Sequence, residues 1–281
     1  MTYREVWQGL TALYGEGEAK AIADYLLDVR FGMTKADILC GGVEALSSQD
    51  ESELNAMLMR LQKAEPVQYV LGQAEFRDRK FRVCSGVLIP RPETEELCEW
   101  IMSEYESKEG IDVLDICTGS GCIAVSLALD MKDKSNVHAW DISDEALAIA
   151  KENAKTLNAD VHFEKRDALS LVPETCRWDI IVSNPPYICN KEKESMSANV
   201  IDYEPSIALF VPDSSPLLFY KAISDYAASS LKKGGNLYFE INPIYVEDIK
   251  TVLISLDFTD IEVKEDMLGK QRMMKACMGS R

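Results

Sequence analysis

The sequence predicts a two-part α/β protein, in which a small helical domain precedes a mostly parallel β-sheet with helices on both faces. Up to about residue 65, apolar residues recur at the three- and four-residue spacing of amphipathic helices. From about residue 93, short apolar segments alternate with longer helical patterns, which is typical of parallel strands joined by helices. A chain of 281 residues is long enough for about two domains.

The first domain is predicted to span residues 1–72. Its helical faces are marked by three groups of apolar residues, and Gly41-Gly42 interrupts the pattern between the second and the third. The groups are Val6, Leu10, Leu13 and Tyr14; Ile22, Tyr25, Leu26 and Val29; and Leu54, Met57, Leu58 and Leu61. These segments predict a small helical bundle.

A β-hairpin and a stiff linker are predicted over residues 73–92. Phe76 and Phe81 flank the polar turn 77–80, which favours two short paired strands. Pro90 and Pro92 then restrict the backbone and exclude a helix interior. We therefore place the boundary of the second domain here, so that it spans residues 93–281.

The second domain is predicted to alternate between helices and strands. The helices are expected at 93–107, from the glycine turn to about 131, at 143–157, 215–231 and 244–255. The strands are expected at 111–116, 137–140, 161–163, 178–183, 236–240, 258–264 and 271–277, with a long loop from Tyr187 to about residue 214. Ser143 is a candidate N-cap of its helix.

Composition and charge exclude several classes of protein. The longest stretch free of Asp, Glu, Lys and Arg is 14 residues, whereas a membrane-spanning helix needs about 20 apolar residues. The N-terminus lacks an apolar signal core, so a cytoplasmic protein is expected. The net charge of −17 disfavours nucleic acid as the main partner. Eight cysteines without a CxxC pair and only two histidines predict no metal site.

A glycine loop follows the predicted strand 111–116. Gly119 and Gly121 allow a sharp turn and a close approach of the backbone to a ligand. Asp141, twenty residues after Gly121, ends the next strand, where a carboxylate can bind two ribose hydroxyls. Asp167 follows the third strand and can accept from an adenine amino group. The loop alone fits both NAD and S-adenosylmethionine, and it also fits a tight turn that binds nothing.

The motif Asn184-Pro185-Pro186-Tyr187 directly follows the fourth strand. Two prolines fix the backbone and remove two N–H donors, which leaves carbonyl oxygens to accept. The Asn184 side chain adds a second acceptor, and Tyr187 offers a flat face for a planar group. Two acceptors at a rigid edge suit an NH₂ group, although the motif considered alone also fits a plain turn after a strand.

This pattern favours methyl transfer to an amide or amino nitrogen. An amide nitrogen is a poor nucleophile because its lone pair is delocalised, but it can pyramidalise if Asn184 and the Pro185 carbonyl hold its two hydrogens. Positioning and electrostatics then replace a strong base. Since an NAD enzyme does not need this motif, the ambiguity of the glycine loop shifts toward S-adenosylmethionine.

The glycine loop, Asp141 and Asn184–Tyr187 together resemble class I S-adenosylmethionine-dependent amino-methyltransferases. Further segments are similar to the peptide chain release factor N(5)-glutamine methyltransferases, the HemK/PrmC family. These segments are 65–76 (EPVQYVLGQAEF), 88–95 (LIPRPETE), Tyr203-Glu-Pro205, Ala208-Leu-Phe210, Gly234-Gly235 and Phe239-Glu240. The resemblance covers nearly the whole chain, although the first 60 residues match only in helical character. It departs at Ile116-Cys117 and at Ala168, where the family often has Leu-Gly and an aromatic residue.

The resemblance implies a Rossmann-like, seven-stranded, mostly parallel sheet, joined by the hairpin to a helical domain that recognises a protein substrate. It implies S-adenosyl-L-methionine as the cofactor, S-adenosyl-L-homocysteine as the product and a class 1 release factor as the partner, methylated on the glutamine of its Gly-Gly-Gln motif. The implied cofactor-binding residues are Cys117, Thr118, Gly119, Ser120, Gly121, Asp141, Asp167, Ala168 and Asn184. The implied catalytic residues are Asn184, Pro185 and Tyr187, and the implied substrate contacts are Asn184, Pro185, Pro186 and Tyr187.

Other functions remain open at this point. An amino-methyltransferase acting on a ribosomal protein glutamine or on a nucleic-acid base would use the same Asn184–Tyr187 chemistry. The acidic second domain and the unbroken segment Pro90–Glu95 argue against these substrates. A protein-binding module that merely keeps the fold has no need of an intact glycine loop together with Asp141 and Asn184.

Overall fold

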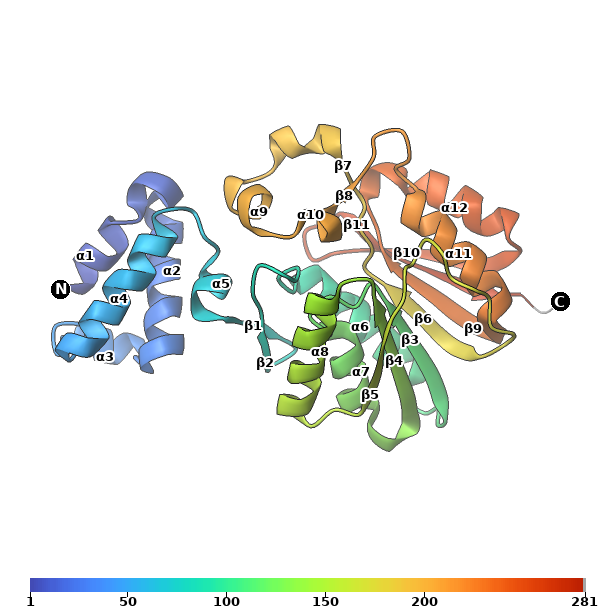
Figure 1. The fold of residues 1–281 in the computed structure, drawn as a ribbon, viewed down its shortest axis with the longest axis horizontal. Coiled ribbons are helices and arrows are strands. Elements are labelled where there is room, and N and C mark those ends of the chain that lie inside the picture. Colours follow the sequence, from blue (N-terminus) through green and yellow to red (C-terminus); the bar gives the residue numbers. More distant parts are fainter. Residues whose placement is uncertain (280–281) are drawn as a thin grey trace. The chain divides into compact units, whose positions relative to one another are not determined.

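The computed structural model describes residues 1–279, which form two compact units. The helical unit contains Met1–Ala74 together with Ser197–Tyr203. The sheet unit contains Glu75–Met196 and the chain from Glu204 onward. Figure 1 shows the elements of each unit in sequence colours.

Six helices build the helical unit within the described chain, and Leu26, Leu27, Leu54 and Leu61 are fully buried in its core. Their bounds are α1 Tyr3–Gln8, α2 Thr11–Phe31, α3 Lys35–Leu39, α4 Ser48–Leu61, α5 Val67–Leu71 and α9 Ala198–Tyr203. Thr2 and Thr34 cap α1 and α3 through reciprocal capping boxes. Helix α9 comes from the second half of the sequence, and its Tyr203 hydroxyl donates to the Lys63 carbonyl over 2.7 Å.

A seven-stranded sheet forms the centre of the other unit, with the strand order β10-β11-β9-β6-β3-β4-β5. The strands are β3 Ile111–Ile116, β4 Ser135–Asp141, β5 Val161–Lys165, β6 Trp178–Ser183, β9 Leu231–Glu240, β10 Phe258–Glu265 and β11 Gln271–Met278. Only β11 breaks the parallel arrangement, since it runs antiparallel to both of its neighbours. The predicted α/β class and the mostly parallel seven-stranded sheet are confirmed.

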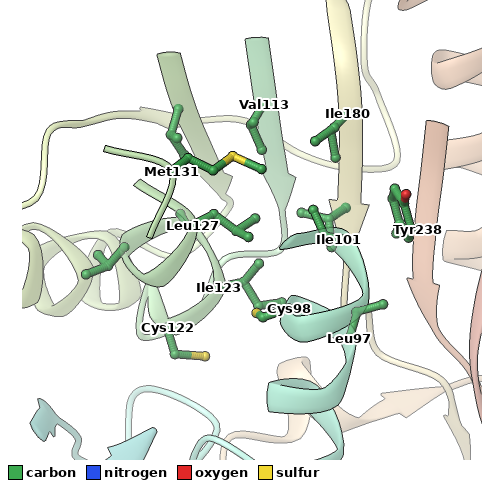
Figure 2. Packing of buried hydrophobic residues seen from close by; sticks show 14 of the residues in the cluster. Leu97, Cys98, Ile101, Val113, Cys122, Ile123, Leu127, Met131, Ile180 and Tyr238 are labelled. Atoms are coloured by element: carbon green, nitrogen blue, oxygen red, sulfur yellow. The ribbon is translucent and has the colours of Figure 1, made fainter. Parts of the chain in front are cut away.

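Helices cover both faces of this sheet (Figure 1). The bounds are α6 Pro92–Tyr105, α7 Cys122–Met131, α8 Asp144–Leu157, α11 Leu218–Ser230 and α12 Val246–Ser255. Helices α6 and α7 contribute to one apolar core, in which Val113 of β3 lies (Figure 2). Helices α11 and α12 contribute to a second core that contains the next residue of β3, Leu114. Consecutive residues of β3 therefore enter opposite cores, which explains why Val113 and Leu114 are both apolar.

The hairpin consists of β1 Gln73–Phe76 and β2 Arg79–Arg82, so its turn is shorter than the predicted 77–80. Arg77 and Arg79 both pair with Asp130 at the end of α7, which holds the turn against the sheet unit. Pro92 is the first residue of α6, a position that tolerates proline because the missing N–H has no helical partner there.

The segment between Tyr187 and residue 214 is not the long loop that the sequence predicts. It forms β7 Ile188–Cys189, η2 Asn190–Ser195, α9, α10 Ser206–Leu209 and β8 Phe210–Val211. Strands of two residues and helices of four to six are too short to produce a visible hydrophobic period. These short elements are held in place by contacts with one another, such as the pairing of β7 with β8.

No helix within residues 1–279 is long and apolar enough to cross a membrane.

Candidate active site

A cavity of about 260 Å³ opens where β3, β4, β5 and β6 end. After β3 the chain continues to β4 and β5 on one side and later returns through β6 on the other, which places the cavity at the switch point of the sheet. Most of the predicted site residues line it: Cys117, Thr118, Gly119, Ser120, Asp141, Asp167, Ala168, Asn184 and Pro186. Gly121, Pro185 and Tyr187 are not among the residues that line it, although each is adjacent in sequence to one that does.

The glycine loop adopts a backbone that needs its glycines. Gly119 and Gly121 have φ of +55° and +80°, in the left-handed region. A Cβ on Gly121 would also lie 3.0 Å from the Cβ of Ala150, so glycine allows α7 to pack closely on α8. Cys117 takes a positive φ as well, which is uncommon for a residue with a side chain.

Asp141 connects this loop to the start of α8. Its Oδ2 accepts from the Gly119 backbone N–H and its Oδ1 from the Ser143 N–H, both over 2.9 Å. Burial raises the pKa of this carboxyl, although the backbone hydrogen bonds act in the opposite direction. Each oxygen of a carboxylate has two acceptor positions, so Asp141 keeps acceptor capacity toward the cavity that it lines.

Asp115, in β3, holds the glycine loop through hydrogen bonds of its carboxylate. Its Oδ2 accepts from the Thr118 hydroxyl over 2.6 Å and from the Ala124 N–H over 3.3 Å. Its Oδ1 is buried without a hydrogen-bond partner in the described structure. Burial raises the pKa of Asp115 to about 7, because an ionised carboxylate with an unpaired buried oxygen is unfavourable.

The end of β5 supplies a polar and an apolar part of the wall. The Asp167 Oδ1 accepts from the Leu169 N–H over 2.9 Å, which shapes the turn after the strand. Ala168 is buried and Leu169 is 43% exposed, and both line the cavity. Together with Ile142 they give this part of the cavity apolar surface.

The Asn184–Tyr187 motif is held by Glu240, the last residue of β9. Asn184 donates through Nδ2 to the Glu240 carboxylate over 2.9 Å, and the Tyr187 hydroxyl donates to its other oxygen over 2.9 Å. Thr94 of α6 donates to the same carboxylate over 2.5 Å. Three donors from two other parts of the chain therefore meet on one side chain.

Glu240 is 3% exposed. Burial raises the pKa of its carboxyl, whereas the hydrogen bonds from Thr94 and Tyr187 stabilise the ionised form. Burial also raises the pKa of the Tyr187 hydroxyl well above its usual range, so Tyr187 stays a donor. The Asn184–Tyr187 motif is therefore held by a buried carboxylate whose hydrogen-bond partners are all donors.

A second buried carboxylate, Glu204, fixes the segment before α6. Its Oε2 accepts from the Ile89 N–H over 3.1 Å, and its Oε1 pairs with the Arg91 guanidinium. Arg91 and Pro90 both line the cavity. Because the side chain of Glu204 is only 1% exposed, this pair secures the cavity wall in a region shielded from water.

Sequence reasoning assigned no role to Thr94, Glu204 or Glu240, although all three lie in segments quoted for the family resemblance. For Glu240 a signal was present, since a charged residue ends the apolar strand Leu237–Phe239. A carboxylate at the carboxyl end of a parallel strand belongs to the ligand edge of the sheet.

Comparisons with known proteins show the family of this chain. Residues 8–72 match the family model of the PrmC N-terminal domain, and residues 95–203 match that of the methyltransferase small domain. A release factor glutamine methyltransferase of Bacteroides thetaiotaomicron is 45% identical over 270 residues, which cover 96% of each chain. One from Flavobacterium psychrophilum is 38% identical and covers 95% of each chain.

The chain belongs to the release factor glutamine methyltransferase family. It is accordingly an S-adenosylmethionine-dependent methyltransferase, as predicted. Among solved structures, a ribosomal protein L11 methylase from Lactobacillus delbrueckii subsp. bulgaricus aligns with a TM-score of 0.51 and 22% identity, covering 74% of this chain and 90% of that chain. That likeness concerns the fold alone.

The pKa of Asp115 leads to a prediction about the stability of this methyltransferase. An ordinary aspartate has a pKa near 3.8, and the folded value is about 7. Between these values the folded protein binds the proton more tightly than the unfolded chain does. The free energy of unfolding should therefore fall by about 4 kcal/mol as pH rises from about 4 to about 7, and then level off with respect to this group.

Asp115→Asn removes this dependence because asparagine is neutral throughout. Urea unfolding of parent and variant at a series of pH values isolates the effect, since other titrating groups cancel in the difference. As pH rises to about 7, the free energy of unfolding of the variant should increase relative to that of the parent. Two curves that stay parallel across this range would show that Asp115 is ionised in the folded protein with an ordinary pKa.

Proposed function

We propose that this enzyme transfers a methyl group from S-adenosylmethionine to the side-chain amide nitrogen of the glutamine in the Gly-Gly-Gln motif of class 1 peptide chain release factors. The observation that carries the proposal is the orientation of Asn184, whose amide hydrogens point to Glu240 and Thr94. Its carbonyl oxygen is left for the cavity that Asn184 lines. The names of the curated relatives support a release factor as the protein substrate.

We assign the cavity to the methyl donor, which has an adenine, a ribose diol and a methionine end. We assign Asp141 to the two ribose hydroxyls, because its carboxylate lines the cavity and is fixed by two backbone amides. Asp167 and Ala168 are assigned to the adenine, and the loop 117–121 to the methionine end, where its backbone lies close to the cavity.

The bound donor supplies an electrophilic methyl group on a sulfonium, which becomes a neutral thioether after transfer. The chain's own residues then have to orient the nucleophile. We assign the Asn184 Oδ1 and the Pro185 carbonyl to the two hydrogens of the substrate amide, and Pro186 and Tyr187 to the support of its plane. Held in this way, the nitrogen can pyramidalise toward the methyl group, so that the N–C bond forms as the S–C bond of the donor breaks, and one amide hydrogen leaves as a proton to solvent water.

The helical unit is assigned to recognition of the protein substrate. The match of residues 8–72 to the PrmC N-terminal domain supports this assignment. We propose residues 73–92 as hairpin and linker and 93–281 as the methyltransferase domain, from which only Ser197–Tyr203 join the helical unit within the described chain. The net charge of −17 suits a basic protein surface better than a phosphate backbone. A substrate that acts in translation also supports a cytoplasmic location for the enzyme.

Asp141→Ala tests the donor assignment. Loss of hydrogen bonds to a charged group costs roughly 1.5–3 kcal/mol, so the affinity for S-adenosylmethionine should fall about 10- to 150-fold. Calorimetric titration measures it, with melting checked in parallel. Asp144→Ala is the matched control, because Asp144 lies three residues away with a side chain that is 79% exposed. Equal donor affinity in Asp141→Ala and the parent would remove Asp141 from the site.

Methyl transfer itself tests the substrate assignment. The purified enzyme is incubated with methyl-labelled S-adenosylmethionine and, separately, with a class 1 release factor, ribosomal proteins and nucleic acid. We expect label on the release factor alone, located by peptide mass spectrometry on the glutamine of Gly-Gly-Gln and absent when that glutamine is alanine. Label on a ribosomal protein or on a base, with none on the release factor, would contradict the proposal.

A further inference from the structure

Glu240 occupies an unfavourable position for a charged side chain. It ends a strand whose preceding residues, Leu237–Phe239, are all buried, and it is itself 3% exposed. Its backbone is fixed as well, because the Tyr220 hydroxyl donates to its carbonyl over 3.2 Å. A buried carboxylate destabilises a fold unless donors surround it, so its presence calls for an explanation from its neighbours.

Each neighbour of the Glu240 carboxylate gives it a hydrogen. Thr94 uses its only hydroxyl hydrogen for the bond to Oε2. Toward Asn184 the Thr94 oxygen is therefore an acceptor, at 3.2 Å from Nδ2. The second neighbour of Nδ2 is Oε2 of Glu240, at 2.9 Å. The Glu240 carboxylate accepts from Thr94, Asn184 and Tyr187, so this side of Asn184 is lined by acceptors.

This arrangement decides which end of the Asn184 amide faces the cavity. The two ends of an asparagine amide have nearly the same shape, and rotation by half a turn exchanges an acceptor for two donors. With acceptors from Thr94 and Glu240 on one side, the NH₂ group must point to them. The carbonyl oxygen is then the end of the amide turned away from both acceptors, and Asn184 is among the residues that line the cavity, as Thr94 is.

We propose that Glu240 is a positioning residue, which fixes the Asn184 amide with its oxygen toward the substrate and thereby makes the site selective for a side chain that ends in NH₂. This inference rests on the proposed function and deepens it, since it predicts that the site binds glutamine and excludes glutamate. A glutamate carboxylate would meet the Asn184 oxygen without a hydrogen between them. Sites that hydrogen-bond one group reject analogues that leave their polar atoms unpaired.

An exchange of the two residue types tests the positioning role. Asn184→Asp alone places two carboxylates side by side, so turnover with saturating donor should fall about 100-fold or more. Glu240→Gln in the same chain restores a donor–acceptor pair with the roles reversed, because the glutamine NH₂ can donate to the new aspartate. The other aspartate oxygen again faces the substrate as an acceptor. The double variant should recover about tenfold or more over Asn184→Asp.

Two single variants separate positioning from general support. Glu240→Gln keeps one oxygen that can accept from Asn184, so it should stay within about tenfold of the parent, whereas Glu240→Leu should lose about 100-fold in kcat. KM for the release factor should change little in both, because one amide is a small part of a protein interface. Donor affinity, measured by calorimetry, should match that of the parent.

Glu104→Gln is the matched control. Glu104 also accepts from three side chains, Trp100, Tyr238 and Lys275, but it lies outside the cavity. This variant should lower the melting temperature without a change in kcat. It shows what the loss of a carboxylate network does when no substrate-facing amide depends on it.

The outcomes are distinguishable. A parent enzyme that leaves the release factor unmethylated overturns the proposed function and the glutamine selectivity with it. An active parent, combined with a folded double variant that is no faster than Asn184→Asp, overturns the positioning role alone. If the double variant does not fold, the Glu240→Leu variant decides, because parent-like kcat there also overturns the role.

Discussion

The positions of Asn184 and Tyr187 depend on their hydrogen bonds to the buried carboxylate of Glu240. It joins α6 through Thr94, the end of β9 on which it stands, and both ends of the motif after β6 through Asn184 and Tyr187. These contacts span 146 and 56 positions in the sequence for Thr94 and Asn184. These hydrogen bonds therefore form only when α6, β6 and β9 are packed together. The proposed chemistry thus depends on the folded sheet.

Buried carboxylates also hold the glycine loop, on the side of the cavity that we assign to the methyl donor. Asp141 at the end of β4 holds the glycine loop through a backbone amide, and Asp115 at the end of β3 holds it from below through Thr118. In both halves, a carboxylate at the carboxyl end of a parallel strand fixes a loop and leaves polar atoms toward the cavity. In the proposed mechanism the sheet places the methyl donor and the substrate amide beside one another without a strong base, in keeping with a chain that has only two histidines.

The sheet was largely predictable, because its buried parallel strands are short, mostly apolar segments between helical patterns. Strand β3 was predicted with its observed bounds, Ile111–Ile116, and β6 with its bounds Trp178–Ser183. Local motifs also placed the glycine loop and Asn184 at the correct edge. The segment after Tyr187 was missed, since its elements depend on contacts such as the bond from the Cys189 N–H to Glu192 rather than on periodicity. The role of Glu240 could not be deduced because its partners are distant in sequence.

The central claim is that Asn184 presents its oxygen to the substrate because Glu240 is an ionised acceptor. Neutron diffraction from a deuterated crystal at neutral pH locates the deuterons that decide this question. The account predicts both Asn184 deuterons on the side of Thr94 and Glu240, a Thr94 deuteron directed at Glu240, and no deuteron on the Glu240 carboxylate. A deuteron on Glu240, or Asn184 deuterons directed into the cavity, would contradict it.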